Sequence, residues 1–241
     1  MTQTEAAIRA TLEELGQNLA VLTSFQREGV VIIDLVRRIF PKARILTIYT
    51  GRLPSATLRM VLKVEQHFGL AIEPMLPADA EVRSMAALHG LDLFRDSVAK
   101  RMLCCEIRKV RPLTKEAKQF DGLFIGLRRG QSEGRKEIPL VDRSQNPARI
   151  SPLVDWSAED VSAYSRMHGL PEHELYAAGY TSIGCDPCTR AVYSGESERA
   201  GRWSWETEAD KECGLHFSAD GRAVRTVDIL LGEVLARANA H

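Results

Sequence analysis

The sequence has no excess charge of either sign. Its 241 residues carry 32 basic and 32 acidic side chains. A neutral total does not favour a nucleic acid or an anionic membrane as partner, so any electrostatic function must come from local groups of charge. Aromatic residues make up only 6% of the chain, and they are not interleaved with basic residues as in a nucleic-acid-binding surface. We therefore expect no nucleic-acid partner.

Long hydrophobic runs are also missing. Aliphatic stretches such as VVII at residues 30–33 are far too short to span a bilayer. The first residues, MTQTEAAIRATLEELGQ, are polar and helix-forming and contain no apolar core of a signal peptide. These absences predict a cytoplasmic protein with no membrane partner. In the cytoplasm the five cysteines are expected to be metal ligands or catalytic groups rather than disulfides.

Short apolar, β-branched segments alternate along the chain with longer amphipathic segments. We expect strands at residues 18–24, 44–50, 71–75, 122–127 and 152–154. We expect helices at residues 29–40, 55–68, 81–88 and 100–111. This alternation is typical of βαβ units. The sequence therefore predicts an α/β fold with a parallel sheet covered by helices.

The amino-acid composition and the periodicity change in the second half of the chain. A further helix should begin at Ser157, because S-A-E-D fits a capping box with Asp160. From about Ala178 the chain is dense in Gly, Cys, Arg and Trp and has no clear period, whereas residues 226–241 return to a helical pattern. We expect an α/β domain over residues 1–177 and an irregular, cysteine-rich lobe with a C-terminal helix over residues 178–241.

The cysteines fall into a pattern that points to metal. Cys185 and Cys188 are separated by two residues, a spacing that suits zinc, an iron–sulfur cluster or a redox disulfide. Cys104 and Cys105 are adjacent. Adjacent side chains diverge by about 100° on a helix, so a bulky cluster at a helix end accepts both sulfurs more comfortably than a compact tetrahedral ion does. Buried thiols, structural zinc and a strained vicinal disulfide remain as alternatives.

Four segments taken in order carry a family resemblance. CCEIRKVRPL, GYTSIGCDPCTR, ERAGRW and KECGLH resemble the assimilatory adenylylsulfate reductases of the sulfonucleotide (PAPS/APS) reductase family, and the likeness runs from about Leu22 to His216. The resemblance implies an adenine nucleotide alpha hydrolase-like sheet domain. It also implies a [4Fe–4S] cluster and a nucleophilic Cys213. The implied cluster ligands are Cys104, Cys105, Cys185 and Cys188.

The chemistry implied by the resemblance is the thiol-dependent reduction of adenosine 5′-phosphosulfate for cysteine biosynthesis. The Cys213 thiolate attacks the substrate sulfur, AMP leaves, and the enzyme carries an S-sulfocysteine. Thioredoxin or a glutathione-type reductant then attacks the Cys213 sulfur and releases sulfite. The cluster has a structural and electrostatic part in this scheme. Assembly into a homo-oligomer is compatible with the sequence.

This chemistry needs cations that bind sulfate and phosphate oxygens. Three arginines follow the expected strand at 122–127, and ligands of open α/β sheets lie at such carboxyl ends. The planar guanidinium of arginine suits bidentate contact with these anions, although a single arginine usually belongs to a solvated surface. The candidate substrate-binding residues are Ser24, Lys109, Arg128, Arg129, Arg135, Arg199 and Arg202.

The loop after the first expected strand departs from the family pattern. Where the family usually shows S-F-G-A-E-D, this chain has S-F-Q-R-E-G, with Gln26 and Arg27 at the small positions and Gly29 at the acidic one. The departure leaves two alternatives open. One is a paralogue with the same cluster that acts on the 3′-phosphorylated nucleotide (PAPS) or on another adenylylated substrate. The other is a non-catalytic iron–sulfur protein, in which Cys213 would be dispensable.

Overall fold

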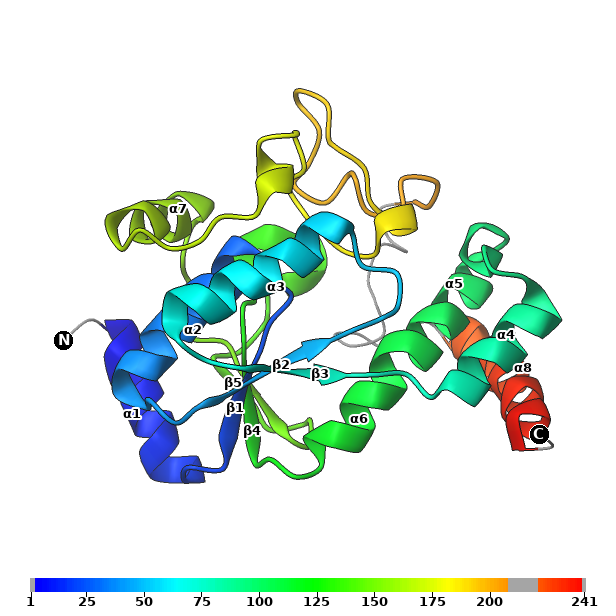
Figure 1. The fold of residues 1–241 in the computed structure, drawn as a ribbon, viewed down its shortest axis with the longest axis horizontal. Helices are drawn as coiled ribbons and strands as arrows, with labels where there is room; N and C mark the ends of the chain where they lie inside the picture. The colour runs from blue at the N-terminus through cyan, green and yellow to red at the C-terminus, as the bar shows by residue number, and fades with distance from the viewer. Residues whose placement is uncertain (1–2, 208–220, 240–241) are drawn as a thin grey trace. The chain divides into compact units, whose positions relative to one another are not determined.

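The computed structural model describes residues 3–207 and 221–239 and shows two compact units (Figure 1). Unit 1 comprises Met1–Thr47, Leu53–Pro74 and Ala117–Arg202. Unit 2 comprises Ile48–Arg52, Met75–Glu116 and Trp203–His241. The predicted domain boundary near residue 178 falls inside unit 1, so that boundary stays a prediction. No helix within the described ranges is long and apolar enough to cross a membrane.

A six-stranded sheet with the order β3-β2-β1-β4-β6-β5 forms the centre of unit 1. β1 pairs in parallel with β2 and β4, and β6 pairs in parallel with β4, whereas β5 pairs antiparallel with β6. The predicted parallel α/β fold is confirmed. The strands are β1 (Leu19–Leu22), β2 (Arg44–Ile48), β3 (Ile72–Met75), β4 (Gly122–Ile125), β5 (Val141–Asp142) and β6 (Ala148–Ile150).

The core of unit 1 lies between this sheet and helix α2 (Arg27–Ile39). The middle of α2 reads VVIIDLV and is buried on all sides, because the helix packs against β1 and β4 on one side and against two helices on the other. Those helices are α1 (Gln3–Leu15) and α7 (Ala158–Met167). Burial of these aliphatic side chains contributes about 1.5–3 kcal/mol for each. The hydrophobic effect therefore anchors α2, and with it the loop that precedes α2.

Helix α3 (Ser55–Phe68) follows β2 at the predicted residues and ends at Gly69, whose left-handed φ of 58° stops the helix. The cap of α7 is also as predicted. The Ser157 hydroxyl accepts a hydrogen bond from the Asp160 amide at 3.0 Å, and the Asp160 carboxylate accepts one from the Ser157 amide at 2.8 Å. Between α7 and residue 207 the chain contains short 3-10 helices and one isolated bridge but no longer helix or strand, as the irregular pattern of this segment predicted.

Unit 2 is built from helices. α4 (Asp79–His89) and α5 (Val98–Cys105) pack against α8 (Gly221–Asn239), and α5 also contacts the short turn η1 (Leu93–Arg95). The chain continues from α5 through η2 (Glu106–Val110) into α6 (Arg111–Ala117). The predicted C-terminal helix corresponds to α8 within the described residues.

Two predictions about these elements were wrong in part. Residues 100–111 do not form one α-helix, because η2 is a π-helix. Pro112 has no amide to bond to the Arg108 carbonyl, and a wider π turn precedes it. Residues 152–154 form a turn rather than a strand: the Val154 amide donates to the Ser151 carbonyl at 3.0 Å. The strand of this region is β6, which ends two residues before Pro152.

Candidate functional site

The loop after β1 turns sharply into α2. The Thr23 hydroxyl accepts a hydrogen bond from the Phe25 amide at 2.9 Å, and Phe25 has a left-handed φ of 60° with a fully buried ring. Such a φ is uncommon outside glycine, so burial of the ring holds the turn. A Cβ at Gly29 would lie 2.3 Å from the Thr23 hydroxyl oxygen. The glycine at the family's acidic position therefore accommodates Thr23.

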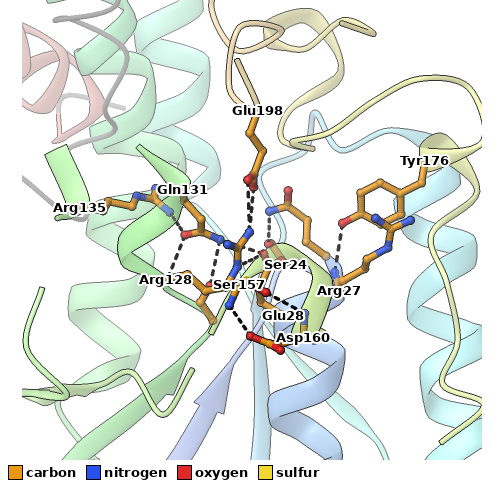
Figure 2. A network of polar contacts seen from close by, with 12 residues as sticks. Ser24, Arg27, Glu28, Arg128, Gln131, Arg135, Ser157, Asp160, Tyr176 and Glu198 are labelled. Atoms are coloured by element: carbon orange, nitrogen blue, oxygen red, sulfur yellow. Dashed lines mark hydrogen bonds and ion pairs between the residues drawn. The ribbon is translucent and has the colours of Figure 1, made fainter. Parts of the chain in front are cut away.

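Arg128, at the carboxyl end of β4, is buried between two carboxylates (Figure 2). Its Nε donates to Glu28 Oε1 at 2.8 Å, and its Nη2 lies 3.2 Å from both carboxylate oxygens of Glu198. Burial raises the pKa of Glu198 above the ordinary value for glutamate, and the charge of Arg128 opposes this shift. Arg128 thus joins the first turn of α2 to the segment around Glu198.

The other two arginines of the expected anion loop differ in their surroundings. Arg135 is buried and donates to Gln131 Oε1 at 2.5 Å, and Gln131 Nε2 donates in turn to Glu28 Oε1 at 3.1 Å. Arg129 instead forms an exposed ion pair with Asp155. The structure therefore brings Arg128 and Arg135 into one network and places Arg129 outside it (Figure 2).

Arg27 is held at the start of α2 by Tyr176 and Glu172. The Tyr176 hydroxyl accepts a hydrogen bond from the Arg27 amide at 3.1 Å, and the Arg27 guanidinium lies 4.0 Å from the centre of the Tyr176 ring. The guanidinium also pairs with the Glu172 carboxylate. Burial raises the pKa of Tyr176 well above its ordinary value. Hence a neutral phenol, not an anion, meets the first amide of this helix.

A cavity of about 400 Å³ opens beside this helix start, wholly within unit 1. Charged and aromatic side chains and small polar ones share its wall. Its lining is Arg27, Glu28, Arg128, Ala158, Val161, Ser162, Tyr176, Gly179, Tyr180, Thr181, Val192, Tyr193, Ser194 and Glu198.

The CxxC pair of unit 1 lies on a tight turn. The 3-10 helix η6 (Asp186–Cys188) places the Cys188 amide 3.0 Å from the Cys185 carbonyl, which also accepts from the Thr189 hydroxyl at 3.0 Å. Arg202 pairs with Thr189 in an isolated antiparallel bridge, and the Arg202 amide donates to the Arg199 carbonyl at 2.9 Å. The two arginines of ERAGRW therefore belong to the segment that packs on the CxxC turn.

The cysteine pair of unit 2 ends helix α5. Cys104 and Cys105 are each 7% exposed, and the π-helix η2 begins directly after them and contains Lys109. The preceding residue of η2, Arg108, is buried and donates to the Thr50 carbonyl at 2.8 Å. Single π turns are frequent at functional sites.

Cysteine chemistry is the test of whether the chain fits an iron–sulfur cluster. All four cysteines of the two pairs are buried, and none of them forms a disulfide. Thiolates are the usual ligands of such clusters, so the donor set fits. Within the described part of the chain, no group of three or more His, Cys, Asp or Glu side chains is arranged around a single ion. Cys213, the predicted nucleophile, lies outside the described residues.

Sequence reasoning missed several residues of the network in unit 1. Glu28 lies in the loop S-F-Q-R-E-G next to Arg27, and Glu198 directly precedes Arg199. A carboxylate beside a basic residue in the sequence could therefore have indicated that both glutamates belong to an ion-pair network. Tyr176 contacts Arg27 from 149 residues away, and no local pattern indicates such a contact. Ser24, the expected hydroxyl ligand, is exposed at the carboxyl end of β1.

Comparison with known proteins gives a consistent result. Residues 18–191 match the phosphoadenosine phosphosulfate reductase domain family. The adenosine 5′-phosphosulfate reductase of Allochromatium vinosum is 42% identical over 201 residues, which cover 83% of this chain and 78% of that protein. The enzyme of the same name from Burkholderia cepacia is 38% identical over 214 residues, covering 88% of this chain and 86% of that protein. A crystal structure of phosphoadenylyl-sulfate reductase from Candida auris, in complex with phosphate, has a TM-score of 0.66 at 23% identity, covering 79% of this chain and 91% of that chain.

Proposed function

The chain belongs to the phosphoadenosine phosphosulfate reductase family, and from this premise we propose that it reduces adenosine 5′-phosphosulfate to sulfite and AMP in sulfate assimilation. The observation that carries the proposal is the presence of two buried cysteine pairs in a chain with this parallel α/β sheet. Arginines pack on the CxxC turn. Two relatives at about 40% identity are named adenosine 5′-phosphosulfate reductase.

We assign the nucleophile to Cys213. Its thiolate attacks the sulfur of the substrate, the bond from sulfur to the bridging oxygen breaks, and AMP leaves with that electron pair. The product on the enzyme is an S-sulfocysteine. A thiolate of the reductant then attacks the Cys213 sulfur, which forms a mixed disulfide and releases sulfite with the electrons of the sulfur–sulfur bond. A dithiol such as thioredoxin resolves the mixed disulfide with its second thiol, and a glutathione-type reductant does so with a second molecule.

The cations are proposed to act in two ways. Lys109, Arg199 and Arg202 neutralise the phosphosulfate group as the thiolate approaches. Arg128 and Arg135 build the loop beside the helix start, because their guanidinium groups are engaged by Glu28, Glu198 and Gln131. Direct contact of Arg128 with substrate would require the substrate to displace a carboxylate. Ser24, with an exposed hydroxyl, is assigned a hydrogen bond to the substrate.

We propose that Cys104, Cys105, Cys185 and Cys188 hold a [4Fe–4S] cluster. When bound, this group would supply structural support and an electrostatic contribution rather than electrons. The chain's own part is to keep both cysteine pairs buried, which limits access of water and oxidants to the sulfurs. A cytoplasmic location, a thioredoxin or glutathione-type reductant and a homo-oligomeric state stay predictions.

Intact-protein mass spectrometry tests the proposal. Anaerobic incubation with adenosine 5′-phosphosulfate and no reductant should add one SO₃ to Cys213, and thioredoxin should release it as sulfite. Cys213→Ser should lose turnover and keep the brown colour of the cluster, whereas Cys105→Ala should lose the colour. Retained turnover in Cys213→Ser would contradict the assignment of Cys213 as the nucleophile.

The altered loop after β1 supports one second candidate. Gln26 and Arg27 replace two small residues there, so a paralogue that acts on the 3′-phosphorylated or another adenylylated nucleotide remains a candidate. A substrate panel in the same mass assay separates the two. An adduct with the 3′-phosphorylated nucleotide and none with adenosine 5′-phosphosulfate would select the paralogue.

A further inference from the structure

We propose that Gln26 is a positioning residue that links the substrate-side hydroxyl of Ser24 to the turn that carries Cys185 and Cys188. The inference rests on the proposed function, because it assigns the substrate contact to Ser24. Gln26 occupies one of the small positions of the family pattern, so the link is a property of this chain.

The contacts of the Gln26 side chain carry the proposal. Its Oε1 accepts a hydrogen bond from the Ile183 amide at 2.7 Å, and its Nε2 donates one to Ser24 Oγ at 3.1 Å. Gln26 is the N-cap residue of α2, but its side chain makes no hydrogen bond to that helix. N-cap side chains commonly bond to their own helix, and here the amide instead joins two other segments.

The orientation of the amide follows from its partners. The Ile183 amide can only donate, so the oxygen of Gln26 must face it and the NH₂ group must face Ser24. The Ser24 oxygen therefore accepts from Gln26. Its own O–H is left to donate outward, which is the polarity that a phosphate or sulfate oxygen requires.

The backbone of Ile183 is also held at its carbonyl group, by Arg202. The Arg202 guanidinium lies 3.4 Å from the Ile183 carbonyl oxygen. A Cβ at Gly184 would lie 2.2 Å from Arg202 Nη2, so the guanidinium occupies the space that a side chain would need. Cys185 is the next residue. The backbone of Ile183, two residues before Cys185, is thus held by Gln26 at its amide and by Arg202 at its carbonyl.

Two variants of similar size separate the two ends of the amide. Gln26→Glu keeps an acceptor for the Ile183 amide but has no N–H for Ser24, whose hydroxyl would then donate to the new carboxylate instead of the substrate. Gln26→Met removes both hydrogen bonds. Gln66→Met, at an exposed position of α3, controls for the exchange itself.

The experiment measures KM for adenosine 5′-phosphosulfate, the rate at which the cluster colour bleaches in air, and hydrogen exchange of the Ile183 amide. Loss of one hydrogen bond to a charged group weakens binding, that is, raises the dissociation constant, by about tenfold or more. We therefore expect Gln26→Glu to raise KM by about that factor. Its bleaching rate and its exchange at Ile183 should stay close to those of the parent protein. We expect Gln26→Met to raise KM and also to accelerate bleaching and exchange severalfold.

Two outcomes overturn the inference. One is a Gln26→Met protein that matches Gln66→Met in all three readouts. The other is a Gln26→Glu protein that bleaches and exchanges as fast as Gln26→Met. If the parent protein forms no S-sulfocysteine at all, the proposed function fails instead. Hydrogen exchange at Ile183, measured without substrate, then still decides whether Gln26 holds the turn.

Discussion

The Arg128 guanidinium lies between Glu28 and Glu198 with a side chain that is 3% exposed. Taking a single charge out of water is expensive, and a buried ion pair offsets that cost only while both partners are present. The stability of this buried ion-pair network therefore depends on all three side chains. Replacing Arg128 with an uncharged residue tests that dependence most directly.

Arg128→Met should lower the free energy of unfolding by about 3–5 kcal/mol, because it leaves two carboxylates near each other without their cation. Arg129→Ala, at the neighbouring residue, removes only an exposed ion pair with Asp155 and should cost less than about 1 kcal/mol. Urea unfolding of both variants makes the comparison. Equal losses of unfolding free energy in the two variants would show that the burial of Arg128 does not make its ion pairs more important for stability than the exposed pair of Arg129.

His173 predicts a pH dependence of stability. Its Nδ1 accepts a hydrogen bond from the Leu175 amide at 3.2 Å, so Nε2 carries the proton and donates to the Thr57 hydroxyl at 3.0 Å. Burial lowers the pKa of His173 below its ordinary value of 6.5, although the Glu174 carboxylate opposes the shift.

The sign of the effect follows from that direction. As pH falls below about 6.5, the unfolded chain takes up a proton before the folded one, so the stabilising contribution of neutral His173 is lost. The parent protein should therefore be more stable than His173→Gln at pH 8, and the difference should shrink between pH 7 and pH 5. Unfolding curves across that range check it. A difference that is constant or grows towards acid would contradict the lowered pKa.

At the scale of elements, α7 begins through a reciprocal cap. The hydroxyl of Ser157 and the carboxylate of Asp160 each accept one amide proton that the helix cannot satisfy by itself. This hydrogen bonding lowers the pKa of the Asp160 carboxyl, with the Ser157 amide as the main donor. Because α7 packs on α2, the cap also supports the helix that presents the β1 loop.

Ser157→Ala should destabilise the protein by about 1 kcal/mol, a typical value for the loss of an N-cap. Ser157→Thr keeps the hydroxyl and should recover most of that loss. Thermal or urea unfolding measures both. If the threonine variant were as unstable as the alanine variant, the hydroxyl would not be the stabilising group.

At the scale of the whole molecule, each unit has its own buried ion pair. In unit 2 the Arg101 guanidinium donates to both carboxylate oxygens of Glu206, at 3.1 and 2.9 Å, and lies 4.6 Å from the Trp203 ring. The side chains of Arg101 and Glu206 are 1% and 3% exposed. This contact ties residues 203–206 to α5, the helix that ends in the cysteine pair.

Arg101→Met should leave the Glu206 carboxylate buried without a partner and cost about 3 kcal/mol or more. Hydrogen exchange should accelerate first in the helices of unit 2, while the strands of unit 1 keep their protection. Arg83→Ala, which removes an exposed ion pair with Asp79 in unit 2, should change neither unit. Acceleration that is uniform across both units would mean that they unfold together.

The sequence by itself determined what depends on near neighbours. The alternation of apolar strands and amphipathic helices predicted the parallel α/β fold, and S-A-E-D predicted the cap at Ser157, because both signals lie within a few residues. The order of CC, CxxC and ECGLH predicted the cluster ligands and the nucleophile through a family resemblance, and both assignments stay predictions. The same reasoning failed at residues 106–110 and 152–154, where Pro112 and Pro152 change the local hydrogen bonding.

Only the tertiary structure decided which charges meet. Arg128 is 100 residues from Glu28 and 70 from Glu198, and Gln26 is 157 residues from Ile183. The contact of Arg128 with Glu28 arises because β1 and β4 are neighbouring parallel strands that end at the same edge of the sheet. Strand order is set by packing of the whole core rather than by local sequence. For that reason the three candidate arginines after β4 looked alike in the sequence, whereas the fold buries Arg128 and Arg135 in one network and leaves Arg129 in an exposed ion pair.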